Sequence, residues 1–183
     1  MVIFLDQSIT PAEYHRFGAR FGALREPPHY VNTMAGDGLP EIGVLTSEDY
    51  GKRADTWHAD VTWLEAPPRY SILHMRHASR EGGDTMWASQ IAGYRNLSAP
   101  MQEFLLGLDA RHGLGDQRSA INPVVHRHPR SGDVALSVNP TFTQAVEGLT
   151  PIESESLLRL CQDATVRPEA MCRWRWSDGQ VAI

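Results

Sequence analysis

The sequence has few of the features that mark membrane-spanning, nucleic-acid-binding or exported proteins. Its 183 residues hold 17 Lys and Arg against 22 Asp and Glu, a formal charge of −5 without any basic stripe, which argues against a nucleic-acid partner. No apolar run approaches the roughly 18 residues that would indicate a transmembrane helix, and the mean hydropathy is −0.35. The first residues carry no basic region and meet Asp6 too early for a signal peptide. We therefore expect a cytoplasmic protein with no membrane partner.

Cysteine is also scarce, with only Cys161 and Cys172 in the chain. Neither belongs to a Cys-x-x-Cys pair, so the sequence predicts no zinc site of that type. In a reducing compartment two such residues are typical of buried free thiols, and we expect both to be reduced and buried.

Repeats, low-complexity tracts and charge blocks are missing as well, which predicts one domain over residues 1–183. Both ends of this stretch are apolar. The chain starts on a strand-like Val2–Leu5 and stops at Val181–Ile183, as if entering another strand. Because native termini are usually polar and loosely held, we expect the sequence to be a piece of a longer domain.

Helices are predicted where capping signals precede apolar periodicity. Thr10 and Thr150 each begin a Thr-Pro-x-Glu capping box, with apolar residues on one face of the helix that follows. A short helix is expected after Ser89. Another is expected through Met101 to Leu108, ending near Gly113.

Strand-like stretches outnumber helices and are separated by long Pro- and Gly-containing loops. They are Val2–Leu5, Ile42–Leu45, Ser71–His77, Val134–Val138 and Met171–Trp176. The irregular order of elements lacks the even rhythm of a parallel doubly wound sheet. A mainly β core with helices at its edge is therefore the predicted fold class.

The most suggestive motif is Trp-His-Ala-Asp-Val-Thr at 57–62. In an extended segment residues i and i+2 project to the same side, so the His58 imidazole and the Asp60 carboxylate should converge. We expect their shared face to open into the interior of the β core. With one distant histidine, such a pair makes the facial triad that holds Fe(II) and leaves positions open for oxygen and a co-substrate. The alternative is a surface or structural His–Asp pair.

Two further motifs allow both a structural and a functional interpretation. Gly82-Gly83-Asp84-Thr85 is typical of a turn entering a strand, but the Thr85 hydroxyl could instead point into a pocket and donate to a carboxylate. Arg-Trp-Arg-Trp at 173–176 predicts a strand with one aromatic and one basic face, or a cation–π or anion-binding surface.

His112 and His128 are the histidines considered as a third metal ligand. For His112 the structural alternative is a histidine at the C-terminal end of a helix, where a cation is favourable. His128 precedes Pro129 and a Ser-Gly pair, which favours a turn.

The order of these motifs along the chain closely resembles the taurine dioxygenase family of Fe(II)- and 2-oxoglutarate-dependent dioxygenases. The resemblance covers essentially the whole chain. It rests on Trp57–Thr62, Pro67–Pro68, Gly82–Trp87, the Tyr-x-x-Leu-Ser-x-Pro run at 94–100, His128–Pro129, Val138–Asn139, Phe142–Thr143, Glu153–Leu158 and Arg173–Trp176.

The resemblance implies a double-stranded β-helix (jelly-roll) core with flanking helices. It implies that His58 and Asp60 are iron ligands and that Thr85 binds 2-oxoglutarate, with O2 as the other co-substrate. Tyr30 and Phe142 match positions that face the organic substrate. A small-molecule substrate is therefore expected, and assembly into a homo-oligomer is left open as an alternative to a monomer.

This sequence also departs from the family pattern. The third ligand, a histidine, and the arginine that pairs with 2-oxoglutarate follow the point where this chain stops, and the family's opening strand and helix are missing. Pro27 and Ala54 replace a histidine and an asparagine that bind taurine. We expect a dioxygenase of this kind that hydroxylates a small organic substrate, such as a sulfonate or alkyl sulfate, with the 183 residues alone inactive. The alternative is a non-catalytic or vestigial scaffold.

Overall fold

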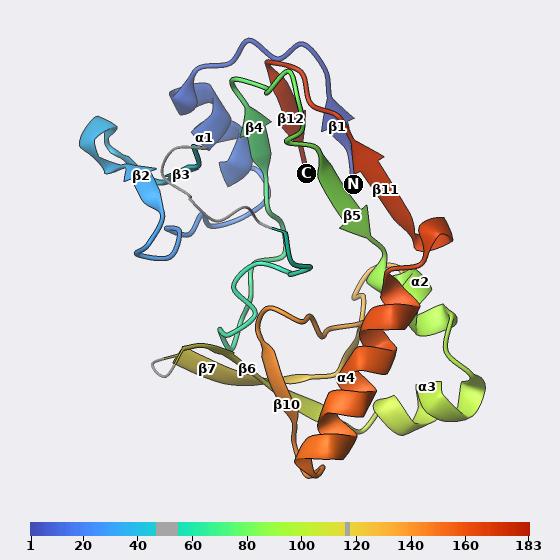
Figure 1. Cartoon of the computed structure of the whole chain (residues 1–183). Coiled ribbons are helices and arrows are strands. Elements are labelled where there is room, and N and C mark those ends of the chain that lie inside the picture. Colours follow the sequence, from blue (N-terminus) through green and yellow to red (C-terminus); the bar gives the residue numbers. More distant parts are fainter. Residues whose placement is uncertain (47–54, 116–117) are drawn as a thin grey trace. The chain divides into compact units, whose positions relative to one another are not determined.

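The structure is a computed structural model that describes residues 1–46, 55–115 and 118–183 (Figure 1). These residues form two compact units, each assembled from separate stretches of the chain. The first contains Met1–Asp55, Pro68–Asp84 and Arg175–Ile183, and the second contains Thr56–Pro67 and Thr85–Trp174. The expectation of one domain over residues 1–183 remains a prediction.

The first unit pairs the two ends of the chain. Strand β12 (Gln180–Ala182) lies between β1 (Ile3–Phe4) and β4 (Leu73–Met75), antiparallel to both. The backbone amide of Val2 donates to the carbonyl of Ile183 at 2.8 Å, and the N and C labels lie side by side in Figure 1. The strands predicted at both ends are therefore present, and they share one sheet.

Helix α1 (Pro11–Ala19) packs beside this sheet and begins as the sequence predicts. The Thr10 side chain accepts from the amide of Glu13, whose carboxylate accepts from Thr10 in return. Tyr14 donates from its hydroxyl to the carbonyl of Ile72, and burial raises its pKa to about 12. The unit also contains the hairpin of β2 (Asn32–Met34) and β3 (Leu39–Val44), joined by the 3-10 turn η1 (Ala35–Asp37).

The second unit contains the other strands, in small antiparallel sheets. In the largest of these sheets, β6 (Asp109–Leu114) lies between β10 (Thr143–Val146) and β7 (Arg118–Pro123). Two pairs complete the set, β8 (Val125–Arg127) with β9 (Val134–Leu136) and β5 (Thr85–Ala88) with β11 (Met171–Trp174).

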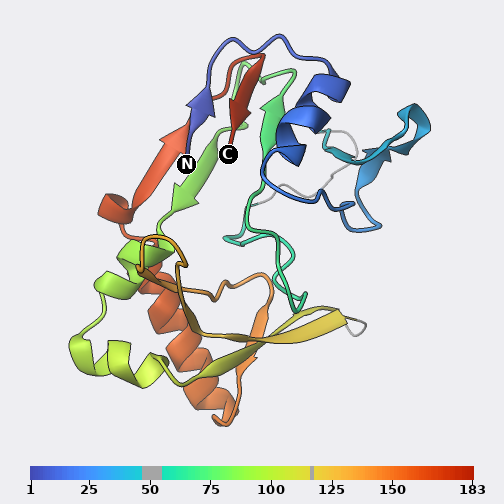
Figure 2. The same ribbon diagram turned by 180° about the vertical axis from the view of Figure 1, so that it is seen from behind.

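Helices α2 (Gln90–Arg95), α3 (Ala99–Leu105) and α4 (Pro151–Thr165) lie together on one side of the β6–β7 ribbon (Figure 2). The α4 helix has the predicted capping box and buries Leu157 and Cys161, while the side chain of Ser89 caps α2 as expected. The hydrophobic core of this unit is formed by Tyr94, Leu97, Leu105, Ala110, Val124, Val125, Leu136, Val138, Val146, Leu157, Cys161 and Ala164.

The chain between Leu105 and Leu114 differs from the prediction. The expected helix ends at Leu105, and Asp109–Leu114 is strand β6 rather than a helix C-terminus. The physical reason is a period-2 pattern that the helical interpretation overlooked, because Ala110 and His112 are buried while Asp109 and Arg111 between them are exposed.

One of the two cysteine predictions is wrong. Cys161 is buried on α4, but Cys172 is exposed on β11. On the face that alternation assigns to Cys172, Trp174 and Trp176, the tryptophan at 176 is buried, Trp174 is half-buried and Cys172 is exposed. Alternation predicts which residues share a face, but not how far along the strand that face is covered.

The predicted fold class is confirmed at the coarser level. All the described strand pairs are antiparallel, and the fold is a mixed, strand-rich one with flanking helices. The described sheets are two- or three-stranded and do not by themselves define a jelly roll, which remains a prediction from the resemblance.

Candidate metal site

His58 and Asp60 converge as their spacing predicts. Nε2 of His58 lies 3.6 Å from Oδ1 of Asp60. On the other side of the ring, Nδ1 of His58 is 2.9 Å from the carbonyl oxygen of Thr56. A carbonyl only accepts, so Nδ1 carries the hydrogen, and in the neutral imidazole the lone pair is on Nε2, facing Asp60. The two side chains thus place two electron-pair donors 3.6 Å apart.

This pair lies at the surface, which corrects the expectation that it opens into the interior of the β core. The side chains of His58 and Asp60 are 36% and 50% exposed. The segment is not a strand either, because Asp60 begins a turn in which the amide of Leu64 donates to the carbonyl of Val61 at 3.1 Å. Convergence therefore comes from an extended dipeptide that enters a turn.

A cavity of about 240 Å³ borders this segment within the second unit. Its lining residues are Trp57, His58, Ala59, Met86, Trp87, Ala88, Gln90, Val138, Asn139, Gln162, Thr165 and Val166. Strand β5 thus contributes the three residues after Thr85 but not Thr85 itself, which starts the strand opposite Trp174. The expectation that Thr85 begins a strand is confirmed, whereas its role toward 2-oxoglutarate remains a prediction.

The two residues expected to face a substrate differ in their surroundings. Phe142 is buried and packs edge-on against Trp63, with ring centroids 4.4 Å apart, and against the His58 ring at 6.2 Å. It therefore forms an apolar wall beside the candidate ligand. Tyr30 belongs to the first unit, where it is exposed and contacts the ring of His29.

His112 does not join the pair. Its ring is fully buried on β6, with Nδ1 3.0 Å from Oγ1 of Thr62 and 3.3 Å from Oγ1 of Thr143. Burial lowers the pKa of His112, so the ring is neutral near pH 7. Among the residues that the structure describes, none forms a hydrogen bond with its Nε2. The helix-end explanation is wrong, and the actual role of this histidine lies in a buried network that the sequence did not reveal.

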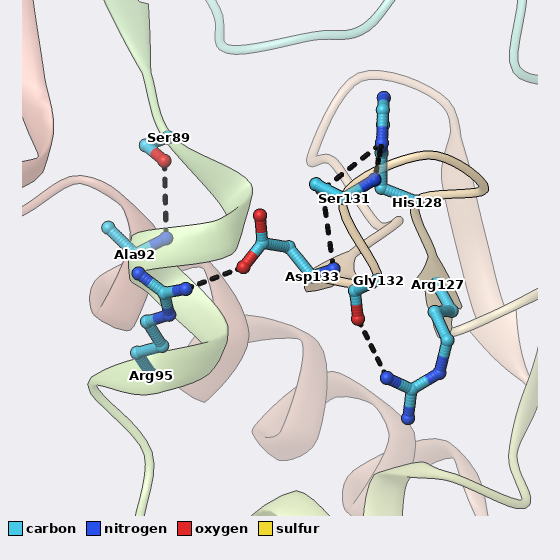
Figure 3. Close-up of polar contacts among 8 residues, drawn as sticks. All are labelled: Ser89, Ala92, Arg95, Arg127, His128, Ser131, Gly132 and Asp133. Atoms are coloured by element: carbon cyan, nitrogen blue, oxygen red, sulfur yellow. Dashed lines mark hydrogen bonds and ion pairs between the residues drawn. The ribbon is translucent and has the colours of Figure 1, made fainter.

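His128 lies in the predicted turn (Figure 3). Its Nδ1 accepts from the amide of Ser131 at 3.2 Å, and its carbonyl accepts from Gly132 at 2.9 Å. Asp133 after the turn pairs with Arg95 of α2 at 2.6 Å. Because the lone pair of Nδ1 accepts the Ser131 hydrogen bond and is not available to a metal, we interpret His128 as a structural turn residue. Across the described ranges, no three His, Cys, Asp or Glu side chains gather into a metal-binding group.

The other residues singled out in the sequence are placed as follows, and a binding role for the Arg-Trp-Arg-Trp motif remains a prediction. β11 covers most of the Arg-Trp-Arg-Trp motif, with the Trp174 ring half-buried and Arg173 exposed. Pro27 lies beside Gly43 of β3, where an added Cβ would come within 3.1 Å of the proline ring. Ala54 lies outside the described residues.

Comparison with known proteins gives the class of this chain. The family model described as "Taurine catabolism dioxygenase TauD, TfdA family" matches residues 1–183. The chain belongs to this family, whose members use 2-oxoglutarate, also called alpha-ketoglutarate, together with a metal.

Individual relatives agree with the family assignment. An alpha-ketoglutarate-dependent sulfate ester dioxygenase from Pseudomonas putida is 35% identical over 87% of this chain and 60% of its own length. The crystal structure of a taurine dioxygenase from Burkholderia xenovorans matches with a TM-score of 0.85 and 35% identity, covering 98% of this chain and 64% of that one. AAD-2, crystallised with Mn(II) and N-oxalylglycine, shares the fold at a TM-score of 0.78 and 20% identity.

The chain spans about 60% of the length of the first curated relatives, 62% and 60% of two of them. Within the residues that the structure describes, no helix is both long and apolar enough to cross a membrane.

Proposed function

We propose that this chain carries the His-x-Asp part of the iron site of a 2-oxoglutarate-dependent dioxygenase. The observation that carries the proposal is the meeting of His58 Nε2 and Asp60 Oδ1 at 3.6 Å, with the hydrogen of the imidazole committed to the carbonyl of Thr56. Metal-ligating histidines commonly donate their other ring nitrogen to a backbone carbonyl, which fixes the tautomer and the ring orientation.

The two donors fit a divalent cation. Nitrogen and oxygen ligands stand about 2.0–2.2 Å from a metal of this size, so two atoms 3.6 Å apart are close enough to share one ion. An imidazole, a carboxylate and a further histidine form the set that suits non-haem Fe(II). The further histidine of the triad is not among the described residues near this pair.

Four residues have distinct roles in this proposal. His58 and Asp60 hold Fe(II), and the Asp60 carboxylate offsets one of its two charges. When bound, the metal couples decarboxylation of 2-oxoglutarate to succinate with oxidation of the substrate by O2. Phe142 excludes water from one side of His58, and Thr85 donates its hydroxyl to a carboxylate of 2-oxoglutarate.

The proposed substrate is a small organic sulfonate or sulfate ester. Support comes from the sulfate ester dioxygenase at 35% identity and the taurine dioxygenase structure at the same identity. Phe142, which is buried beside the His58 ring, supplies an aromatic surface that an alkyl chain would contact. Pro27 lacks the hydrogen-bonding side chain expected for binding taurine, which favours a less polar substrate.

Metal binding by the purified 183-residue chain tests the proposal directly. Co(II) replaces Fe(II) without oxidising in air, and its visible absorption reports ligation. We expect weak saturable binding that is lost in His58→Ala and in Asp60→Ala, because each substitution leaves one protein ligand. His128→Ala is the matched control and should bind as the original chain does. Equal binding by all four proteins would refute the proposal.

Turnover gives a second, independent measurement. We expect no succinate from the chain with 2-oxoglutarate, Fe(II), ascorbate, air and an alkyl sulfate, because a third ligand is missing from the described site. Succinate above the protein-free control that disappears in His58→Ala would show that another histidine or a second copy completes the site.

A further inference from the structure

We infer that a buried polar network of Thr62, His112 and Asn139, together with Thr141, holds the 57–62 segment in the conformation that brings His58 and Asp60 together. These four residues are therefore positioning residues for the candidate metal site. The inference rests on the proposed function for its purpose, while the contacts that carry it are independent of any metal.

The C-terminal end of the segment is fixed at Thr62, two residues after Asp60. The Thr62 hydroxyl lies 3.0 Å from Nδ1 of His112 and accepts from the side-chain amide of Asn139 at 3.2 Å. Its backbone carbonyl accepts from the Asn122 side chain at 2.8 Å. Thr62 is 9% exposed and His112 is fully buried, so these bonds are shielded from competing water.

Asn139 is itself held firmly. Its side-chain oxygen accepts from the backbone amide of Phe142 at 2.9 Å, and its backbone amide donates to the Thr143 hydroxyl at 2.9 Å. The same Thr143 hydroxyl reaches Nδ1 of His112 at 3.3 Å. Strands β6 and β10 and the turn before β10 thus present one preformed surface to Thr62, rather than side chains that must be ordered by it.

The N-terminal end of the segment is fixed by a separate contact. The Thr141 hydroxyl donates to the backbone carbonyl of Trp57 at 2.9 Å. Because Thr141 lies in the same turn as Asn139 and Phe142, one short stretch of chain fixes both ends of the segment. His58 and Asp60 lie between these two attachment points.

The backbone between the attachment points requires such support. Val61 has φ = 55°, a left-handed conformation that a β-branched residue adopts only at a cost in free energy. The residue lies directly between Asp60 and Thr62. Without the hydrogen bonds of Thr62, the chain would relax toward an ordinary extended conformation, and the carboxylate of Asp60 would turn away from His58.

The network suits this task because it is neutral. Its members are two threonines, an asparagine and a histidine whose burial disfavours the charged form. A charged group at this depth would compete with the metal for Asp60 or repel the ion. Neutral hydroxyl and amide groups orient the backbone without altering the charge of the site.

Hydrogen exchange of the full 183-residue chain, followed by mass spectrometry, tests the inference without a metal. Thr62→Val keeps the shape of the side chain and removes the hydroxyl. We expect the amides of residues 57–64 to exchange at least tenfold faster, with α4 unchanged. Thr62→Ser keeps the hydroxyl and should restore slow exchange. Ser154→Ala, which removes another buried hydroxyl hydrogen bond from the same unit, should leave residues 57–64 unaffected.

Co(II) binding is then measured on the same proteins. Affinity should fall about tenfold in Thr62→Val, the size of effect expected when support for a ligand is lost. Unchanged exchange and unchanged affinity in Thr62→Val would overturn the inference. If the original chain binds no Co(II), the proposed function fails, and exchange at 57–64 still decides the inference.

A second variant covers the case in which Thr62→Val fails to fold. Thr141 is exposed, so Thr141→Val removes the N-terminal attachment with little disturbance of the core. Faster exchange at residues 57–59 in this variant, reversed in Thr141→Ser, supports the inference. Exchange equal to that of the original chain in a folded Thr141→Val contradicts it.

Discussion

Oγ1 of Thr62 and Nδ1 of His112 lie 3.0 Å apart inside the second unit, although 50 residues separate them along the chain. The contact joins the turn after Asp60 to strand β6. It gives His112 a structural role that is separate from metal binding, although histidine is also a common metal ligand and the chain carries the His58-x-Asp60 motif.

The buried His112 should make stability depend on pH. Its pKa is lowered by burial from the usual 6.5, so below about pH 6.5 the unfolded chain binds a proton that the folded chain rejects. The free energy of unfolding should therefore fall as the pH drops, by up to about 1.4 kcal/mol per pH unit from this group. Urea unfolding between pH 7.5 and 5 measures the slope.

His112→Gln provides the comparison, because glutamine does not titrate. Its slope below pH 6.5 should be shallower than that of the original chain, whatever its absolute stability. The pKa values of His74 and His126 are also lowered by burial, but they contribute equally to both proteins. Identical slopes would contradict a buried neutral His112.

Gly93 on α2 should tolerate no side chain. A Cβ there would lie 2.4 Å from the Thr165 hydroxyl and 3.0 Å from the Thr165 Cα, which is backbone and cannot move away cheaply. Gly93→Ala should lower the free energy of unfolding by about 1–3 kcal/mol. Gly107→Ala is the control, since nothing lies within 4 Å of its added Cβ, and its effect should stay within about 1 kcal/mol. Urea midpoints give both values.

The two thiols should differ in reactivity. Cys161 is buried and its pKa is raised to about 11, whereas Cys172 is exposed. Iodoacetamide at pH 8 should add one group to the folded chain and two in denaturant, as read from intact mass. Cys172→Ser should remain unmodified when folded. Rapid double modification of the folded chain would show that α4 does not shield Cys161.

Thr85→Val should weaken binding of 2-oxoglutarate roughly tenfold while leaving Co(II) affinity unchanged, because a hydroxyl that donates to a carboxylate is lost and no ligand is touched. Thr85→Ser should keep most of the affinity. Calorimetric titration of 2-oxoglutarate into the Co(II)-loaded chain measures the change. Equal affinities in all three proteins would make Thr85 a strand residue only.

Features that depend on interactions between residues close together in the chain were predicted correctly from the sequence. Both capping boxes predicted their helices correctly, because Thr10 and Thr150 act on backbone amides three residues away. The i, i+2 spacing of His58 and Asp60 was enough to predict their convergence. The ordered set of motifs indicated the family, since many weak signals in a fixed order are specific together.

Tertiary structure decided what depends on partners distant in the sequence. Composition could not reveal that His112 lies opposite Thr62 or that Thr141 supports Trp57, because each contact needs β6, the turn before β10 and the 57–62 segment to be folded together. The strand at Asp109–Leu114 was missed because its alternation of buried and exposed residues is short and closely follows helix α3. Burial of Cys172 was wrongly expected because alternation predicts which residues share a face, and not how far along the strand that face is covered.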